Sequence, residues 1–123
     1  MNPFKLIKSM FTPVPRTTAT ECLDRVRSGA VVLIDVREPS EWAAGVAERA
    51  VLLPFSDLTG GRMRWQPFLA AHDGREILLY CAAGGRSAIA AKLLATEGFK
   101  TANAGGFPEW ASAGWPVVSP KSR

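Results

Sequence analysis

Two runs of consecutive apolar residues constrain the fold of this chain more than any other feature of its sequence. Val31-Val32-Leu33-Ile34 and Ile77-Leu78-Leu79-Tyr80 leave almost no polar position to face water. Such runs are typical of strands that are covered on both faces, as in parallel sheets. Weaker strands are predicted over residues 51–53 and 101–104. Because strands that alternate with helices across short turns form a parallel sheet, the sequence predicts an α/β fold.

The segments between the strands carry helix start and stop signals. Thr18 and Glu21 form a capping-box pattern, which predicts a helix that ends at Gly29. A second strong helix is predicted over residues 87–97, with apolar residues along one side. Shorter helices are predicted over residues 39–44, over residues 67–71 and around Trp110.

Length and composition narrow the class of protein. A chain of 123 residues with 47% hydrophobic and 21% charged residues fits one soluble globular domain. Its net charge of +4 comes from scattered Lys and Arg, which suits a small anionic substrate but not nucleic acid. Two Cys and one His are too few for a disulfide scaffold or a metal site, so we expect no metal and a reducing, cytoplasmic location. No apolar run approaches the roughly 20 residues that cross a membrane.

Prolines divide the chain into a main domain and an extension. Pro13 and Pro15 interrupt the backbone, so we expect an N-terminal extension over residues 1–16, a domain over 17–120 and a tail over 121–123. Residues 1–11 mix Lys with large apolar side chains but lack the continuous apolar stretch of a signal peptide. We expect a short amphipathic turn that rests on this or a neighbouring protein, with contact to a membrane surface as the alternative.

The segment with the clearest chemistry is the Cys81 loop, residues 81–86 (Cys-Ala-Ala-Gly-Gly-Arg), which follows the Ile77 strand. Ligands of parallel α/β sheets gather at the carboxyl ends of strands. Gly84 and Gly85 allow successive N–H groups to point inward. The helix that starts near Ser87 adds its positive dipole end, and Arg86 adds a permanent charge.

Each of these features favours a thiolate at Cys81, and the thiolate is the reactive form of cysteine. The same N–H groups and positive charges would hold the anion that forms next, whether a persulfide or a phosphate. The competing interpretation is an inert cysteine packed at the end of a strand. The glycines, Arg86 and the helix start lie in register with Cys81, and this combination favours the catalytic interpretation.

These segments together resemble the rhodanese family of sulfurtransferases. The similarity covers residues 17–118 and follows the order of the family's motifs. It rests on Asp35-Val36-Arg37-Glu38 followed by Glu41 and Trp42, on Cys81 to Arg86 as C-x-x-G-x-R, on Gly105-Gly106-Phe107-Pro108-Glu109-Trp110, and on Gly114-Trp115-Pro116-Val117. The chain departs from the family at residues 45–50, which lack the usual His and Pro. It also has Asn103 where an apolar residue is usual, which we expect to loosen an edge strand.

The resemblance implies a three-layer fold with a central parallel sheet of about five strands flanked by helices. It also implies transfer of a sulfane sulfur in two steps. The Cys81 thiolate would take sulfur from thiosulfate or another persulfide donor, and Ala82, Ala83, Gly84, Gly85, Arg86 and Ser87 would hold the resulting Cys81 persulfide. A thiol, a protein or cyanide would then accept the sulfur, without any metal or organic cofactor.

Two other functions remain open. Phosphatases and arsenate reductases of the same fold use a loop one residue longer, so the six residues from Cys81 to Arg86 favour sulfur transfer. A docking module without turnover is the other alternative, although such modules often lack the cysteine that this chain retains.

Several further residues have two interpretations each. Arg86 either orients an anionic donor or braces the loop through Asp35 or Glu38. Asp35 and Arg37 either support the loop from behind or form a simple surface ion pair. Ser87 either aids the persulfide or caps a helix.

For three residues outside the loop, a purely structural role is the preferred interpretation. Cys22 is either half-buried packing or a resolving partner for Cys81, and packing is the simpler expectation. Trp65, which lies beside Arg62 and Arg64, is expected in a solvated loop, with an exposed basic docking patch as the alternative. His72 is expected to cap a helix end.

Overall fold

The computed structural model describes residues 2–120 and contains the predicted central parallel sheet. Four strands lie in the order β3-β1-β4-β5, and all neighbours are parallel. Their bounds are Val51–Leu52 for β3, Val31–Asp35 for β1, Glu76–Cys81 for β4 and Thr101–Gly106 for β5. An isolated parallel bridge between Arg16 and Asn103 extends the sheet beyond β5. The α/β class is therefore confirmed, with four strands and this bridge in place of about five strands.

The two long apolar runs form the centre of the sheet. Strand β1 is buried along its whole length, and β4 is buried from Ile77 onward. Their register pairs Val32 with Ile77 and Asp35 with Tyr80. Since parallel strands end at a common edge, this register brings the end of β1 beside the residue that precedes Cys81.

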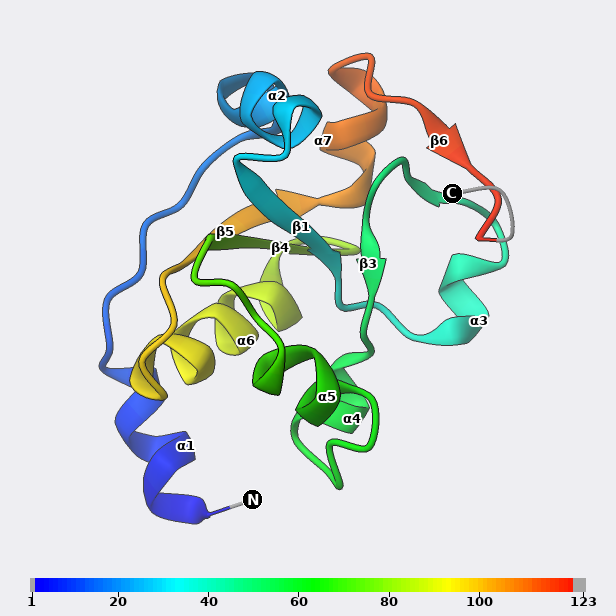
Figure 1. The fold of residues 1–123 in the computed structure, drawn as a ribbon. Helices are drawn as coiled ribbons and strands as arrows, with labels where there is room; N and C mark the ends of the chain where they lie inside the picture. Colours follow the sequence, from blue (N-terminus) through cyan, green and yellow to red (C-terminus); the bar gives the residue numbers. More distant parts are fainter. Residues whose placement is uncertain (1, 121–123) are drawn as a thin grey trace.

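Helices cover both faces of the sheet, which produces the expected three layers (Figure 1). Helices α2 (Ala19–Ser28) and α7 (Phe107–Ser112) cover one face and share a core with Val31 and Leu33. Helices α4 (Phe55–Leu58), α5 (Trp65–Ala70) and α6 (Gly85–Thr96) cover the other. That second core contains Val32, Ile34 and Cys81. Alternate residues of β1 thus face opposite layers, as strand geometry requires.

The strongest local signals in the sequence are confirmed. Thr18 and Glu21 form the predicted capping box of α2, and Gly29 ends this helix with a positive φ of 81°. Helix α3 (Pro39–Trp42) lies where a short helix was expected. The structure adds an antiparallel pair of two-residue strands, β2 (Val46–Ala47) and β6 (Val117–Val118), which the sequence pattern did not indicate.

The interpretation of the segment around Trp65 is wrong. Helix α5 begins at Trp65 rather than at Pro67. The Trp65 side chain is fully buried, and its Nε1 donates a hydrogen bond of 2.9 Å to the carbonyl of Pro54. Arg62 does not form a free basic patch, because it makes two hydrogen bonds of 2.7 Å to Glu97. An indole that finds an internal acceptor is buried with little penalty.

The N-terminal segment forms helix α1 (Pro3–Met10), which rests on α6 as the packing interpretation expected. Lys5 pairs with Glu97, and Thr12 hydrogen-bonds Thr96 across 3.0 Å. The outward side of this segment exposes Phe4 and Phe11, each by 81%. Contact of residues 1–11 with a membrane surface stays a prediction.

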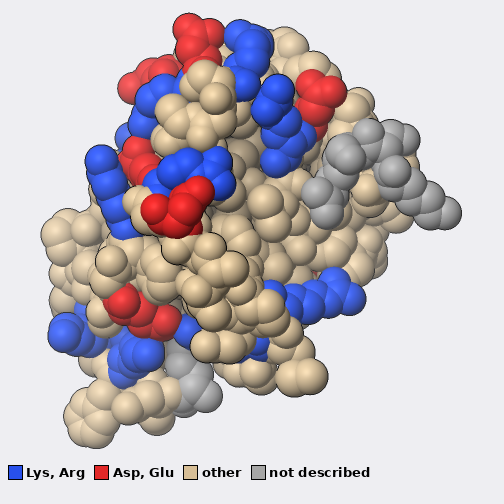
Figure 2. All heavy atoms as spheres, in the orientation of Figure 1, with Lys and Arg blue, Asp and Glu red and all other residues tan. Residues whose placement is uncertain are grey.

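Charged side chains of both signs are interspersed over the face shown in Figure 2, where they form no continuous basic stripe. Among residues 2–120, no helix has the length and apolar character needed to cross a membrane. The expected tail at residues 121–123 lies outside the described residues.

Candidate active site

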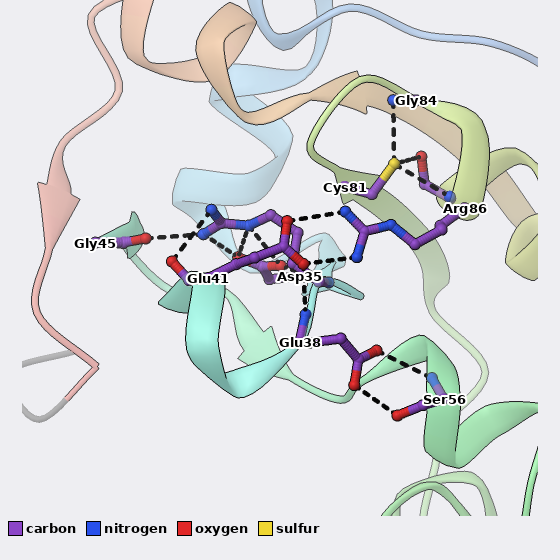
Figure 3. Close-up of polar contacts among 10 residues, drawn as sticks. Asp35, Glu38, Glu41, Gly45, Ser56, Cys81, Gly84 and Arg86 are labelled. Carbon is purple, nitrogen blue, oxygen red and sulfur yellow. Dashed lines mark hydrogen bonds and ion pairs between the residues drawn. The ribbon is translucent and has the colours of Figure 1, made fainter. Parts of the chain in front are cut away.

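Cys81 is the last residue of β4, and its loop turns directly into α6 (Figure 3). Gly84 has a φ of 97°, a left-handed conformation that favours glycine, and it is the N-cap of α6. The loop leans on the end of β5. A Cβ atom at Gly106 would lie 2.7 Å from the carbonyl oxygen of Ala82, so only glycine permits this close approach.

Three hydrogen bonds converge on the sulfur of Cys81. The N–H of Gly84 donates across 3.0 Å, the N–H of Ser87 across 3.4 Å and the hydroxyl of Ser87 across 3.3 Å. Burial, which leaves Cys81 only 1% exposed, raises the pKa of its thiol, but hydrogen bonds from Ser87, Ala83 and Gly84 outweigh it. The net effect is a lowered pKa, so the loop stabilises a thiolate.

The Arg86 side chain extends from the start of α6 toward Glu41 of α3. Its guanidinium donates two parallel hydrogen bonds to Glu41, with Nη1–Oε1 at 2.6 Å and Nη2–Oε2 at 2.9 Å. This pair lowers the pKa of Glu41 to about 2. This contact braces the loop. The sequence suggested Asp35 or Glu38 as the partner of Arg86, whereas the partner in the structure is Glu41.

Glu38 instead connects α3 to α4. Its carboxylate accepts hydrogen bonds from the N–H and the hydroxyl of Ser56 (Figure 3). The N–H of Glu38 in turn donates to the carboxylate of Glu41 across 3.0 Å. The Cys81 loop is therefore linked through Arg86, Glu41 and Glu38 to the helices beside it.

Asp35 and Arg37 form a buried pair, which contradicts the surface ion-pair interpretation. Arg37 Nη2 lies 2.9 Å from Asp35 Oδ2, and both side chains are almost inaccessible. Tyr80 donates a hydrogen bond of 2.6 Å to the same oxygen, and burial raises the pKa of its hydroxyl. The Arg37 guanidinium stacks 4.2 Å above the ring of Phe107. This network holds Tyr80, the residue directly before Cys81, and so lies behind the loop.

Asn103, like Glu41, is a site residue whose role the sequence did not predict. Its side chain hydrogen-bonds Ser87, Gly84 and Gly105, and only 5% of it is exposed. Its backbone pairs with the carbonyl of Pro15 and the N–H of Thr17. The expected loosening of the edge strand is therefore wrong, because the N-terminal segment covers that edge. The signal that the sequence offered for this role was an amide side chain in a strand whose other residues are all small.

Cys22 lies on the other side of the sheet from Cys81. It is fully buried in the α2 core, and its Sγ lies 3.0 Å from the carbonyl of Thr18. Burial raises the pKa of its thiol. The packing interpretation is confirmed, with Cys22 fully buried rather than half-buried. The sheet separates Cys22 from the loop, which excludes a resolving role in this fold.

His72 also packs internally. Its ring lies between Phe68 and Phe99 at the end of α5, and its Nε2 hydrogen-bonds the carbonyl of Arg75. Among the described residues, no three His, Cys, Asp or Glu side chains are grouped so that they could hold a metal ion.

Comparisons with known proteins agree on one family. The family model of the rhodanese-like domain matches residues 18–113. A protein of Allochromatium vinosum named sulfurtransferase is 36% identical over 93 residues, which cover 74% of this chain and 81% of the relative.

Two solved structures resemble the chain along most of its length. A rhodanese-related protein from Thermoplasma volcanium is 28% identical, with a TM-score of 0.70, and the match covers 85% of this chain and 97% of that one. A protein of unknown function from Rhodopseudomonas palustris, described as a possible tyrosine phosphatase, is 27% identical, with a TM-score of 0.72 and coverage of 93% and 91%. Since the family model matches well over half of the residues, the chain belongs to the family of rhodanese-like domains.

Proposed function

We propose that this chain is a sulfurtransferase that carries a sulfane sulfur on Cys81. The observation that supports this most directly is the convergence of three hydrogen-bond donors on the Cys81 sulfur. They lower the pKa of a thiol that burial alone would raise. A thiolate held in this way is the nucleophile that sulfur transfer requires. The relative named sulfurtransferase supports the same class.

In the first step, the Cys81 thiolate attacks the outer sulfur of thiosulfate. A new S–S bond forms at Cys81, the S–S bond of thiosulfate breaks, and sulfite leaves with the electron pair. The product is a Cys81 persulfide, whose negative charge lies on the outer sulfur. The N–H groups of the loop and the N-terminus of α6 favour this charge.

In the second step, an acceptor thiolate or cyanide attacks the outer sulfur. The persulfide S–S bond breaks, and its electron pair returns to Cys81 as thiolate. Sulfur passes between nucleophiles without an external oxidant or reductant, and the chemistry of each step is carried by Cys81 and the loop donors. We propose a small anionic donor and a thiol or protein acceptor, in a reducing cytoplasm that keeps Cys81 reduced.

The experiment compares three purified proteins: the wild type, Cys81→Ser and the matched control Cys22→Ser. Each is incubated with thiosulfate, analysed by mass spectrometry, and then treated with cyanide. We expect one added sulfur on Cys81 in the wild type and in Cys22→Ser, released as thiocyanate. No addition should occur in Cys81→Ser.

A parallel incubation with an aryl phosphate separates this function from the phosphatase alternative. Phosphate release that depends on Cys81, without any thiocyanate, would replace sulfur transfer with phosphatase activity. Modification confined to Cys22, or no reaction of either kind, would favour a docking module.

A further inference from the structure

The side chain of Asn103 is held in one orientation by groups that can only donate or only accept. The N–H of Gly105 donates to Oδ1 across 3.1 Å, and Nδ2 donates to the carbonyl of Gly84 across 3.2 Å. Oδ1 therefore faces Ser87, whose hydroxyl donates to it across 2.8 Å. An amide inside β5 thus contacts both the Cys81 loop and the first turn of α6.

The Ser87 hydroxyl has one proton and more than one acceptor. Its oxygen lies 2.8 Å from Asn103 Oδ1 and 3.3 Å from Cys81 Sγ, and the carbonyl of Gly105 is a more distant third acceptor at 3.5 Å. Ser87 is 0% exposed, so bulk water does not compete for this proton. At any moment the hydroxyl can donate to the amide oxygen or to the sulfur, but not fully to both.

The charge on Cys81 decides between these acceptors. A neutral thiol is a weak acceptor and a weak donor, so its S–H donates to Ser87 Oγ while the Ser87 hydroxyl donates to Asn103. A thiolate is a strong acceptor and draws the hydroxyl toward itself. Formation of the thiolate therefore breaks the hydrogen bond between Ser87 and Asn103.

We propose that Asn103 is a positioning residue, which binds the Ser87 hydroxyl while Cys81 is a neutral thiol and releases it to the sulfur when the thiolate forms. Asn103 thereby stabilises the resting thiol and limits the help that Ser87 gives to the nucleophile. In the proposed sulfur transfer, the charge moves from Sγ to the outer sulfur, and the hydroxyl returns to Asn103. Only this last step rests on the proposed function.

Several charged groups surround Cys81 and also affect its titration. They are Arg86 of α6, Glu38 and Glu41 beside it, Asp35 and Arg37 behind the loop, and the Arg16–Glu109 pair next to Gly84 and Gly105. A neutral substitution at Asn103 removes none of these charges. A change in the titration of Cys81 then reports the hydrogen bond of Ser87.

The test uses Asn103→Leu and Asn103→Asp, both in a Cys22→Ser background that leaves Cys81 as the one thiol. The rate of alkylation by iodoacetamide is measured against pH, and thermal unfolding confirms that each variant is folded. Asn103→Leu removes the nearest competing acceptor and leaves only the Gly105 carbonyl at 3.5 Å, so the thiolate-to-thiol ratio at a given pH should rise by about ten-fold. Asn103→Asp retains the acceptor and adds a negative charge, so the midpoint of the Cys81 alkylation should move to higher pH.

Ser87→Ala supplies the matched control. Asn103→Leu should lower the alkylation midpoint when Ser87 is present and leave it unchanged when residue 87 is Ala. If Asn103 merely shaped the loop, Asn103→Leu and Asn103→Asp would both misplace the N–H donors and both raise the midpoint. That result, or an unchanged midpoint in folded Asn103→Leu protein, overturns the proposal.

A measurement on the wild type covers the case in which the variants do not fold. The side-chain amide resonances of Asn103 in an NMR titration should shift with the same midpoint as the alkylation of Cys81. Resonances that stay constant across this midpoint overturn the proposal. Neither readout requires sulfur transfer, so a wild type that forms no thiocyanate would contradict the proposed function while these titrations still decide the role of Asn103.

Discussion

The guanidinium of Arg86 lies against the carboxylate of Glu41, with two donor–acceptor distances of 2.6 and 2.9 Å. The pair joins the first turn of α6 to α3 and fixes the direction in which Arg86 leaves the Cys81 loop. A guanidinium that is paired with a carboxylate in this way contributes little net positive charge to the mouth of the loop. This relationship has consequences for stability, for catalysis and for pH dependence.

Glu41→Gln should lower the stability of the protein and leave donor binding almost unchanged. The pair is about one-third exposed, so solvent screening limits the loss in the free energy of unfolding to about 1 kcal/mol. We expect the KM for thiosulfate to stay within about two-fold, since the loss of one screened charge is worth little. Urea unfolding and steady-state kinetics measure the two effects. A KM that falls strongly in this variant would mean that a freed Arg86 binds the donor.

The same pair makes stability depend on pH in the acid range. The pKa of Glu41 is lowered to about 2 in the folded protein, against about 4.3 in an unfolded chain. Its contribution is therefore fully present above the unfolded pKa and lost as pH falls toward 2. The stability difference between the wild type and Glu41→Gln should be constant above about pH 5 and vanish near pH 2. A difference that persists at the acid end would contradict this assignment.

Arg37→Met should destabilise the protein far more than removal of an exposed arginine. It leaves the buried Asp35 carboxylate without its cation, and such losses cost about 3–5 kcal/mol. Arg27 forms an exposed pair with Asp24 and lies 5.4 Å from the centre of the Trp115 ring. Arg27→Met is the matched control, which should change the free energy of unfolding by about 1 kcal/mol or less. Urea unfolding measures both effects. Equal losses in the free energy of unfolding would show that the buried pair contributes no more to stability than the exposed pair.

Gly106→Ala should impair the Cys81 loop without a general loss of fold. Its new Cβ would meet the carbonyl of Ala82 at 2.7 Å, so the loop must move, and displacements of this kind reduce rates by about 100-fold. At Gly61 the nearest atom to a new Cβ is a flexible Met63 carbon at 4.0 Å. Gly61→Ala is therefore the control, with kcat/KM for thiosulfate as the measurement. Full activity in Gly106→Ala would mean that the loop tolerates this shift.

The exposed side of α1 leads to a prediction about membranes. Phe4 and Phe11 are each 81% exposed, and residues 2–16 contain Lys and Arg but no acidic residue. We expect the protein to co-sediment with anionic lipid vesicles more than with zwitterionic ones, and less at high salt. Phe4→Ser together with Phe11→Ser should abolish the binding, whereas Met63→Ser, at an equally exposed site elsewhere, should retain it. Binding that ignores lipid charge would contradict the prediction.

Much of the fold could be predicted because its signals are local in sequence. The apolar runs at Val31 and Ile77 form β1 and β4, and the Thr18–Glu21 capping box begins α2. Cys81 could be placed at the end of a strand for the same reason. These features depend on neighbouring residues, so a single sequence contains them.

The remaining features depend on contacts between distant segments. Glu41 and Arg86 are 45 residues apart, and several carboxylates near Asp35 are equally plausible partners until α3 is placed. Strands β2 and β6 are two residues long and pair across most of the chain. Asn103 stands out as a polar residue in a strand, but only the folded loop brings Ser87 and Gly84 to its amide.

The separation of Cys22 and Cys81 by the sheet also determines how the protein can recover from oxidation. These are the only two cysteines in the sequence, and they belong to cores on opposite faces. A sulfenic acid on Cys81 therefore has no internal thiol with which to form a protective disulfide. Repair must come from a small thiol or a reducing protein that enters at the loop, and without such a supply peroxide would convert Cys81 irreversibly to its sulfinic form.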